Sequence, residues 1–213
     1  MKKYYAEILG TFALVFCGTG AIVINQETGG VITHVGIALT FGLIVMVMIY
    51  ALGPVSGAHF NPAVTIAFSL AKRFPAKEIL PFVISQSIGA FLASFTLRIM
   101  FPANEFLGST RPLGSDLQSF VLELILTFFL MLVIIQVATG SREQGMFAGL
   151  AIGSTVLLEA MFAGPISGAS MNPIRSIAPA VVSTNFDHLW IYLSAPVVGS
   201  ALAVLVWKVI KSE

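Results

Sequence analysis

Two Asn-Pro pairs, which begin at Asn61 and Asn172, are the strongest chemical signal in the sequence. Asparagine is a favoured helix N-cap, and proline suits the first helical position because its missing N–H would have no partner there. We therefore predict short helices over Asn61–Leu70 and Asn172–Val182, each about 15–17 Å long. Each reaches across about half of a ~30 Å hydrocarbon core, so these segments enter a membrane without crossing it.

The chemistry expected at these helix starts is hydrogen-bond donation to a neutral molecule. A helix N-terminus carries roughly half a positive charge and unpaired N–H groups. If the two N-termini meet, the amides of Asn61 and Asn172 donate to a passing oxygen from both sides. Such donors interrupt a proton-conducting chain of water, and the positive helix ends repel cations. The alternative is that both residues only cap their helices; their occurrence as a matched pair favours a pore.

Composition places these segments in lipid. The chain has 213 residues, of which 57% are hydrophobic and 10% charged, whereas soluble domains are about 45–50% apolar and about 25% charged. A net charge of +1 argues against an electrostatic nucleic-acid binder. Cys17 is the only cysteine, so the sequence holds neither a disulfide framework nor a thiolate metal cluster. We expect no metal and no cofactor.

Six runs are long and apolar enough to cross a bilayer, which requires about 20 residues. The predicted fold class is an all-α membrane protein with six transmembrane helices and two re-entrant half-helices. The short links give no sign of a second domain, so residues 1–213 are predicted to form one transmembrane domain. The predicted spans are Tyr5–Ile24, Val35–Leu52, Leu80–Met100, Leu117–Val137, Met146–Ala163 and Leu189–Ile210.

The distribution of Lys and Arg orients the chain. Eight basic residues fall on the side of the amino terminus, against Arg98 and Arg111 on the other side, and Arg175 lies at membrane depth. Both termini are therefore predicted to be cytoplasmic, in a multi-pass protein of the cell (plasma) membrane. The eight residues are Lys2, Lys3, Lys72, Arg73, Lys77, Arg142, Lys208 and Lys211.

The two halves of the chain, about 1–101 and 117–213, repeat each other. The segment Ser-Gly-Ala-His-Phe-Asn-Pro begins at Ser56, and Ser-Gly-Ala-Ser-Met-Asn-Pro begins at Ser167. Glu7, in Glu-Ile-Leu-Gly-Thr-Phe, likewise corresponds to Glu123, in Glu-Leu-Ile-Leu-Thr-Phe. Each half holds three spans, so the second half inserts upside down. Inverted repeats with interrupted helices place their site at the bilayer midplane, where the half-helix ends point at it.

The segments Ser56–Thr65 and Ser167–Ser176 resemble the two signatures of the aquaporin (major intrinsic protein) family. The likeness covers essentially the whole chain, and Thr40–Tyr50 and Phe162–Met171 are most similar to the nodulin-like intrinsic proteins and their bacterial aquaglyceroporin-type relatives. The resemblance implies the aquaporin fold, a homotetramer with one pore in each subunit, and passive conduction of small uncharged molecules. It assigns the midplane motifs to Asn61, Pro62, Ala63, Asn172, Pro173 and Ile174.

The resemblance also assigns the selectivity filter, an outer constriction of four side chains, to Phe41, Ala160, Ala169 and Arg175. Strict water channels of the family usually carry His at the position of Ala160. Here two methyl groups face an apolar ring and a guanidinium that donates hydrogen bonds. This combination favours water together with glycerol or urea, and it also suits a neutral oxyacid such as arsenous or boric acid.

Other positions bear on solute selection. Ser176 and Ala180 stand where glycerol facilitators usually have Asp and a basic residue, which favours a water-selective channel as the alternative. Tyr192-Leu193 lacks the Trp that water channels often carry in the last span, which favours the solute channel. Ile174 replaces the family's usual Ala, so we expect extra bulk beside the midplane, narrowing the pore or shifting the half-helix.

Four polar residues are candidates for supporting or lining the pore. Glu7 and Glu123 are each expected to accept hydrogen bonds from the re-entrant loop of their own half, whose N–H groups need partners at that depth. A proton relay is the alternative for both. His59 is expected to make a structural hydrogen bond rather than to gate. Glu159 has no counterpart in the first half, and it either lines the outer pore or forms a buried salt bridge with Arg175.

Other function classes lack the residues that they require. A secondary transporter also uses inverted repeats and broken helices, but it needs a coupling-ion site, and the Asn-Pro segments contain no acidic residue. An ion channel needs rings of carbonyls or charges. The sequence shows no nucleophile–base pair, metal cluster or phosphate loop, so it does not predict an enzyme.

Overall fold

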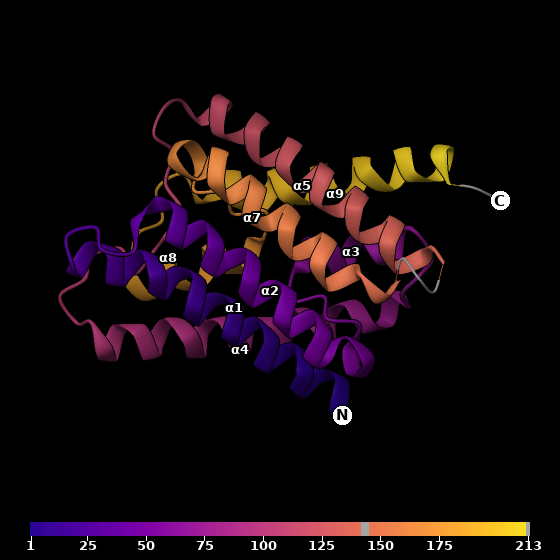
Figure 1. Ribbon diagram of the computed structural model, residues 1–213, viewed down its shortest axis with the longest axis horizontal. Helices are drawn as coiled ribbons and strands as arrows, with labels where there is room; N and C mark the ends of the chain where they lie inside the picture. The colour runs from indigo at the N-terminus through magenta and orange to yellow at the C-terminus, as the bar shows by residue number, and fades with distance from the viewer. Residues whose placement is uncertain (142–144, 212–213) are drawn as a thin grey trace.

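The computed structural model describes residues 1–141 and 145–211, which form helices joined by loops (Figure 1). Six helices in this part of the chain are long and apolar enough to cross a membrane. Arg142, one of the residues that orient the chain, lies outside the described residues. The elements are α1 Lys2–Glu27, α2 Thr33–Ser56, α3 Pro62–Leu70, the 3₁₀ turn η1 Ala76–Glu78, α4 Ile79–Met100, α5 Asp116–Thr139, α7 Ala148–Ser167, α8 Pro173–Ser183 and α9 Leu189–Ile210.

Several of the long helices run past the ends of the apolar runs that predicted them. α7 continues through Pro165 to Ser167, where the sequence predicted an end at Ala163. A proline removes its own N–H from the ladder and its ring crowds the carbonyl four residues earlier. Pro165 lies two residues before the end of α7, so only the last turn of the helix is affected. Both α2 and α7 stop at a left-handed glycine, Gly57 with φ 88° and Gly168 with φ 86°. Glycine adopts positive φ without a steric penalty, which makes it a natural helix terminator.

The two half-helices begin at their prolines, and each is capped by the preceding asparagine. The side-chain oxygen of Asn61 accepts from the N–H of Ala63 at 2.9 Å, and that of Asn172 accepts from the N–H of Ile174 at 3.1 Å. In Figure 1, α3 and α8 lie toward opposite ends of the molecule, and both chain termini lie at the α3 end. The half-helices therefore enter from opposite sides.

Glycines set the closest approaches between the long helices. A Cβ on Gly89 would collide with the carbonyl oxygen of Ile8, so α4 packs directly against the backbone of α1. Gly199 stands in the same relation to the carbonyl oxygen of Leu124, which brings α9 onto α5. These matching contacts join two long helices within each half of the chain.

The two halves meet where α2 crosses α7. A Cβ on Gly42 would lie 2.6 Å from the carbonyl oxygen of Gly153, and a Cβ on Gly153 would lie 2.6 Å from the carbonyl oxygen of Gly42. The contact is thus reciprocal, with equivalent residues of the two halves touching each other. Such mutual contact is expected where two similar halves pack around a shared axis.

Polar and apolar side chains are distributed as they are in a lipid-embedded protein. The outer face of α2 exposes an apolar stripe at helical spacing, which includes Val35, Leu39 and Leu43. In contrast, the interior holds Glu7 and Glu123 fully buried. Lipid requires the outer surface to be apolar, and ionisable groups within the membrane then face the interior.

Candidate functional site

The two Asn-Pro loops meet in the middle of the molecule and hold each other through asparagine amides. The Nδ2 of Asn61 donates to the carbonyl oxygen of Met171 at 2.7 Å, and the Nδ2 of Asn172 donates to the carbonyl oxygen of Phe60 at 2.9 Å. Each amide oxygen already caps its helix. Because an amide nitrogen carries two protons, one N–H of each asparagine remains for a molecule in the adjoining cavity.

A cavity of about 410 Å³ runs beside these amides. Both asparagines line it, as do the loops that precede them, so it joins the two half-helix starts. Its other walls come from the apolar faces of α1, α2, α3, α5 and α7. Those walls include Leu14, Val45, Ile49, Val64, Leu130, Ile134, Ile152 and Val156.

The four residues of the predicted constriction all line this cavity. They are Phe41 on α2, Ala160 on α7, Ala169 in the second loop and Arg175 on α8. The guanidinium carbon of Arg175 lies 5.0 Å from the centroid of the Phe41 ring, a distance at which a cation is attracted by an aromatic face. The cavity wall thus includes a hydrogen-bond donor close to an aromatic ring, together with two methyl groups.

Arg175 is 1% exposed, and its placement depends on the loop between α4 and α5. Its Nη1 donates to the carbonyl oxygen of Gly108 at 2.8 Å. The sequence did not predict this contact, because a carbonyl acceptor leaves no residue-type signal. Arg175 and Glu159 form no ion pair among residues 1–141 and 145–211, so the salt bridge considered from the sequence is absent there.

The remaining midplane residues lie in the packed core around the cavity. Ile174 is 3% exposed and belongs to the hydrophobic core, and it is not among the residues that line the cavity. The expected narrowing by its bulk is therefore not seen. The reason is packing: the side chain of Ile174, in the first turn of α8, is buried in the hydrophobic core. Pro62, Pro173 and Ala63 are buried at the same helix starts.

Glu7 accepts hydrogen bonds from donors in the first re-entrant loop, and equivalent donors occur in the second repeat. Its two carboxylate oxygens accept from the backbone N–H of His59 at 3.0 Å and of Phe60 at 2.8 Å, and from the hydroxyl of Ser56 and the amide of Gln86 at 2.8 Å each. These bonds satisfy loop N–H groups that neither water nor a helix can reach.

Glu123 makes the equivalent contacts in the second half. It accepts from the backbone N–H of Ser170 and Met171, both at 2.8 Å, and from the hydroxyl of Ser167 at 2.7 Å. The two acids therefore perform the same positioning task for the two re-entrant loops.

His59 lines the cavity from within an aromatic cluster. Its Nδ1 lies 3.1 Å from the hydroxyl of Thr65, and its ring stacks on Phe68 with a centroid distance of 4.9 Å. Phe74 and Phe82 flank the same ring at 4.8 Å and 5.2 Å. This packing fixes the imidazole in one orientation.

Glu159 does not line the cavity. It is 3% exposed on α7, and its Oε2 has no hydrogen-bond partner within the described ranges. Its side chain therefore lies behind the pore wall, although its neighbour Ala160 forms part of that wall.

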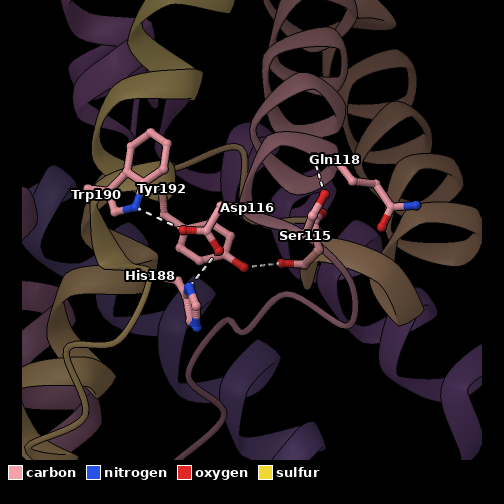
Figure 2. Close-up of polar contacts among 7 residues, drawn as sticks. Ser115, Asp116, Gln118, His188, Trp190 and Tyr192 are labelled. Carbon is pink, nitrogen blue, oxygen red and sulfur yellow. Dashed lines mark hydrogen bonds and ion pairs between the residues drawn. The ribbon is translucent and has the colours of Figure 1, made fainter.

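A polar cluster joins the N-terminal ends of α5 and α9 (Figure 2). The Nδ1 of His188 lies 2.6 Å from the carboxylate of Asp116, and the indole of Trp190 donates to the same carboxylate at 3.3 Å. One turn along α9, the hydroxyl of Tyr192 donates to the carbonyl oxygen of Ser167 at 2.7 Å. α9 thus holds the start of the second re-entrant loop.

Comparisons with known proteins agree with this geometry. Residues 1–207 match the family model described as Major intrinsic protein. The chain is 50% identical to Aquaporin NIP1-1 of Oryza sativa subsp. japonica, over 99% of this chain and 75% of that protein. It is 48% identical to Nodulin-26 of Glycine max, over 99% of this chain and 78% of that protein.

A solved structure shares the fold. The aquaglyceroporin from Plasmodium falciparum superimposes with a TM-score of 0.87, covering 98% of this chain and 96% of that one, at 28% sequence identity. The six apolar helices and the two half-helices therefore form the aquaporin fold.

Proposed function

The chain belongs to the major intrinsic protein family of membrane channels, and from this premise we propose that it conducts water and small uncharged solutes and excludes ions and protons. Glycerol and urea are the leading solutes, and arsenous and boric acid are further candidates. Proteins of this family are channels rather than enzymes, and the six apolar helices make this one a multi-pass membrane protein.

One observation carries the choice of solute. Phe41 and Arg175 line the same cavity as Ala160 and Ala169, which add only methyl groups to its wall. A polyol presents hydroxyl oxygens to the guanidinium and its carbon skeleton to the ring, so both faces of the solute find a matching surface. The similarity to an aquaglyceroporin agrees with a pore that admits more than water.

Exclusion of ions follows from the charges around the path. The half-helices direct two positive N-termini at the midplane, and Arg175 adds a full positive charge further along the cavity. A neutral molecule exchanges its hydrogen bonds with water for bonds to the free N–H groups of Asn61 and Asn172. A cation gains nothing comparable, and a proton meets donors rather than a continuous chain of water.

A water-selective channel is the second candidate. It is favoured by Ser176, which occupies the position of the Asp of glycerol facilitators and is fully engaged in hydrogen bonds to other hydroxyls. In that case Phe41 is the narrowest point.

An osmotic assay separates the two candidates. The protein is reconstituted in liposomes, and light scattering is followed after a shock with an impermeant solute and then with glycerol. We expect fast shrinkage in both and fast re-swelling in glycerol. Shrinkage without re-swelling identifies the water-selective pore, and counter-flow exchange that saturates with glycerol concentration identifies a transporter.

We further propose a homotetramer in the cell membrane, with residues 1–213 forming one domain and both termini in the cytoplasm. The exposed apolar stripe on α2 offers a surface for a neighbouring subunit or for lipid. Native mass spectrometry of the detergent-solubilised protein distinguishes a tetramer from a monomer.

A further inference from the structure

Buried contacts fix the position of the loop between α4 and α5 over the outer end of the cavity. Leu107 is fully buried within it, and the amide oxygen of Asn104 accepts from the N–H of Leu107 at 2.9 Å. Gly108 follows with φ 72°, and a Cβ on it would lie 2.8 Å from the Cβ of Thr19. No larger residue fits there, and the loop cannot move closer to α1.

This loop supplies the acceptor that holds Arg175. The bond from Nη1 to the carbonyl oxygen of Gly108 is the one hydrogen bond recorded for the guanidinium within residues 1–141 and 145–211, and Nε has no partner there. The Phe41 ring attracts the group without fixing its direction. The position of the Gly108 carbonyl therefore sets where the guanidinium lies against the cavity.

Two residues further along, Thr110 joins the loop to the second Asn-Pro segment. Its hydroxyl donates to the hydroxyl of Ser176 at 2.8 Å, and the hydroxyls of Ser176 and Ser170 are 2.6 Å apart. The hydroxyl of Ser170 donates to the carbonyl oxygen of Asn172 at 2.9 Å. A hydroxyl has one proton, so Ser176 donates to Ser170, and the three bonds run in one direction from Thr110 to Asn172.

The Thr110 hydroxyl is well placed to couple the position of the α4–α5 loop to that of the second Asn-Pro segment. The side chains of Thr110 and Ser176 are buried and do not line the cavity, so water does not readily replace the bond between them. The side chain of Thr110 also packs on Gly168, where a Cβ would lie 3.0 Å from its methyl carbon. The residue is thus fixed against the loop that carries Ala169 and the helix that carries Arg175.

We propose that Thr110 is a positioning residue for solute selection. Its bond to Ser176 holds the α4–α5 loop on the second Asn-Pro segment, so that the Gly108 carbonyl keeps Arg175 against the cavity wall. Without that bond, the loop and the guanidinium move together and the outer constriction widens. The proposal rests on the proposed function, in which Phe41, Ala160, Ala169 and Arg175 form that constriction.

The test compares flux ratios, which do not depend on how much protein is folded. Thr110→Val keeps the shape of the side chain and removes the hydroxyl. In liposomes, we expect the ratio of erythritol flux to water flux, and the ratio of proton flux to water flux, to rise by about threefold or more, the size of effect expected for one buried hydrogen bond. Thr110→Ser restores the hydroxyl and is expected to keep both ratios near those of the unmodified protein.

Two further variants sharpen the result. Thr96→Val is the matched control, because the hydroxyl of Thr96 bonds only to the carbonyl oxygen of Leu92 in its own helix. Ser176→Ala removes the other end of the link and replaces Thr110→Val if that variant does not fold. If the shared bond is the cause, the double variant shows the ratios of either single one rather than their product.

The outcomes separate this proposal from the function on which it rests. If the unmodified protein passes water but no glycerol, the solute channel is wrong, and Thr110 is judged on the proton-to-water ratio alone. If Thr110→Val and Ser176→Ala both keep the unmodified ratios, Thr110 only packs the loop and the proposal fails.

Discussion

At the scale of single residues, the cavity wall combines two small side chains with two large ones. Ala160 and Ala169 leave room where Phe41 and Arg175 take it, and all four line the same cavity. Selection by such a constriction depends on the volume that remains and on the donors that face it. Substitutions at these positions are therefore expected to change which molecule passes before they change the fold.

Ala160→His is predicted to make the pore more selective for water over glycerol. The imidazole fills the space beside Arg175 and adds a second polar group, so glycerol flux is expected to fall by about tenfold, equivalent to about 1.4 kcal/mol of added barrier. Water flux is expected to change by less. Stopped-flow light scattering measures both on one sample. Ala160→Gly serves as the control, since it leaves the space open, and an equal loss of glycerol flux in both variants contradicts the role of volume.

Arg175→Val is predicted to let protons or cations leak. The substitution removes the positive charge and the bond to Gly108, so proton flux under a membrane potential is expected to rise by about tenfold or more. A pH-sensitive dye inside the liposomes reports it. Arg111→Val is the control, because Arg111 is exposed on the outer loop over the ring of Phe106. A leak of equal size in both variants points to general disruption.

At the scale of elements, acids hold the re-entrant loops and glycine contacts join the long helices. Glu7 and Glu123 accept hydrogen bonds from loop N–H groups, while Gly89 lets α4 approach α1 and Gly199 lets α9 approach α5. The glycine contacts are rigid, because the glycine backbone lies directly against the backbone of the neighbouring helix. A side chain added at either glycine therefore cannot be accommodated by rearranging other side chains.

Gly89→Ala and Gly199→Ala are predicted to destabilise the protein without a direct effect on the pore. Each new Cβ meets a carbonyl oxygen, Ile8 in one case and Leu124 in the other, at a cost of about 1–3 kcal/mol or more. Gly53→Ala is the matched control: Gly53 lies in α2 with nothing within 4 Å of an added Cβ, and loss of a helical glycine stabilises by about 0.5–1 kcal/mol. Thermal unfolding in detergent ranks the three, and a stable Gly89→Ala variant contradicts the close approach.

At the scale of the whole molecule, the charge pattern and the arrangement of the termini agree. Both ends of the chain lie at the same end of the molecule as α3 (Figure 1), and the basic residues Lys2, Lys3 and Lys208 lie near those termini. The opposite end carries α8 (Figure 1).

Cysteine labelling tests the orientation. In a Cys17→Ser background, Lys2→Cys is predicted to react with a membrane-impermeant thiol reagent only after cells are opened. Leu113→Cys, at an exposed position in the α4–α5 loop, is predicted to react on intact cells. Labelling of position 2 from outside contradicts the predicted topology.

The sequence by itself determined the fold class and the places where the chain interrupts its helices. Six apolar runs, two Asn-Pro pairs and the repeat of Glu7 at Glu123 were sufficient, because membrane insertion, capping and burial of acids all depend on local residue types. Helix ends were harder to predict from the sequence: α7 passes through Pro165, although proline is locally a helix-breaking residue.

Only the tertiary structure decided how the residues of the proposed constriction are held. The acceptor for Arg175 is a backbone carbonyl at Gly108, and the link at Thr110 joins hydroxyls 66 positions apart in the chain. Every residue has a carbonyl, and serines and threonines are common, so neither partner is marked by its type. The same reason explains Ile174, whose bulk suggested a narrower pore although its side chain is buried in the core. Residue type sets what a side chain can do, and the packing of the chain sets what it faces.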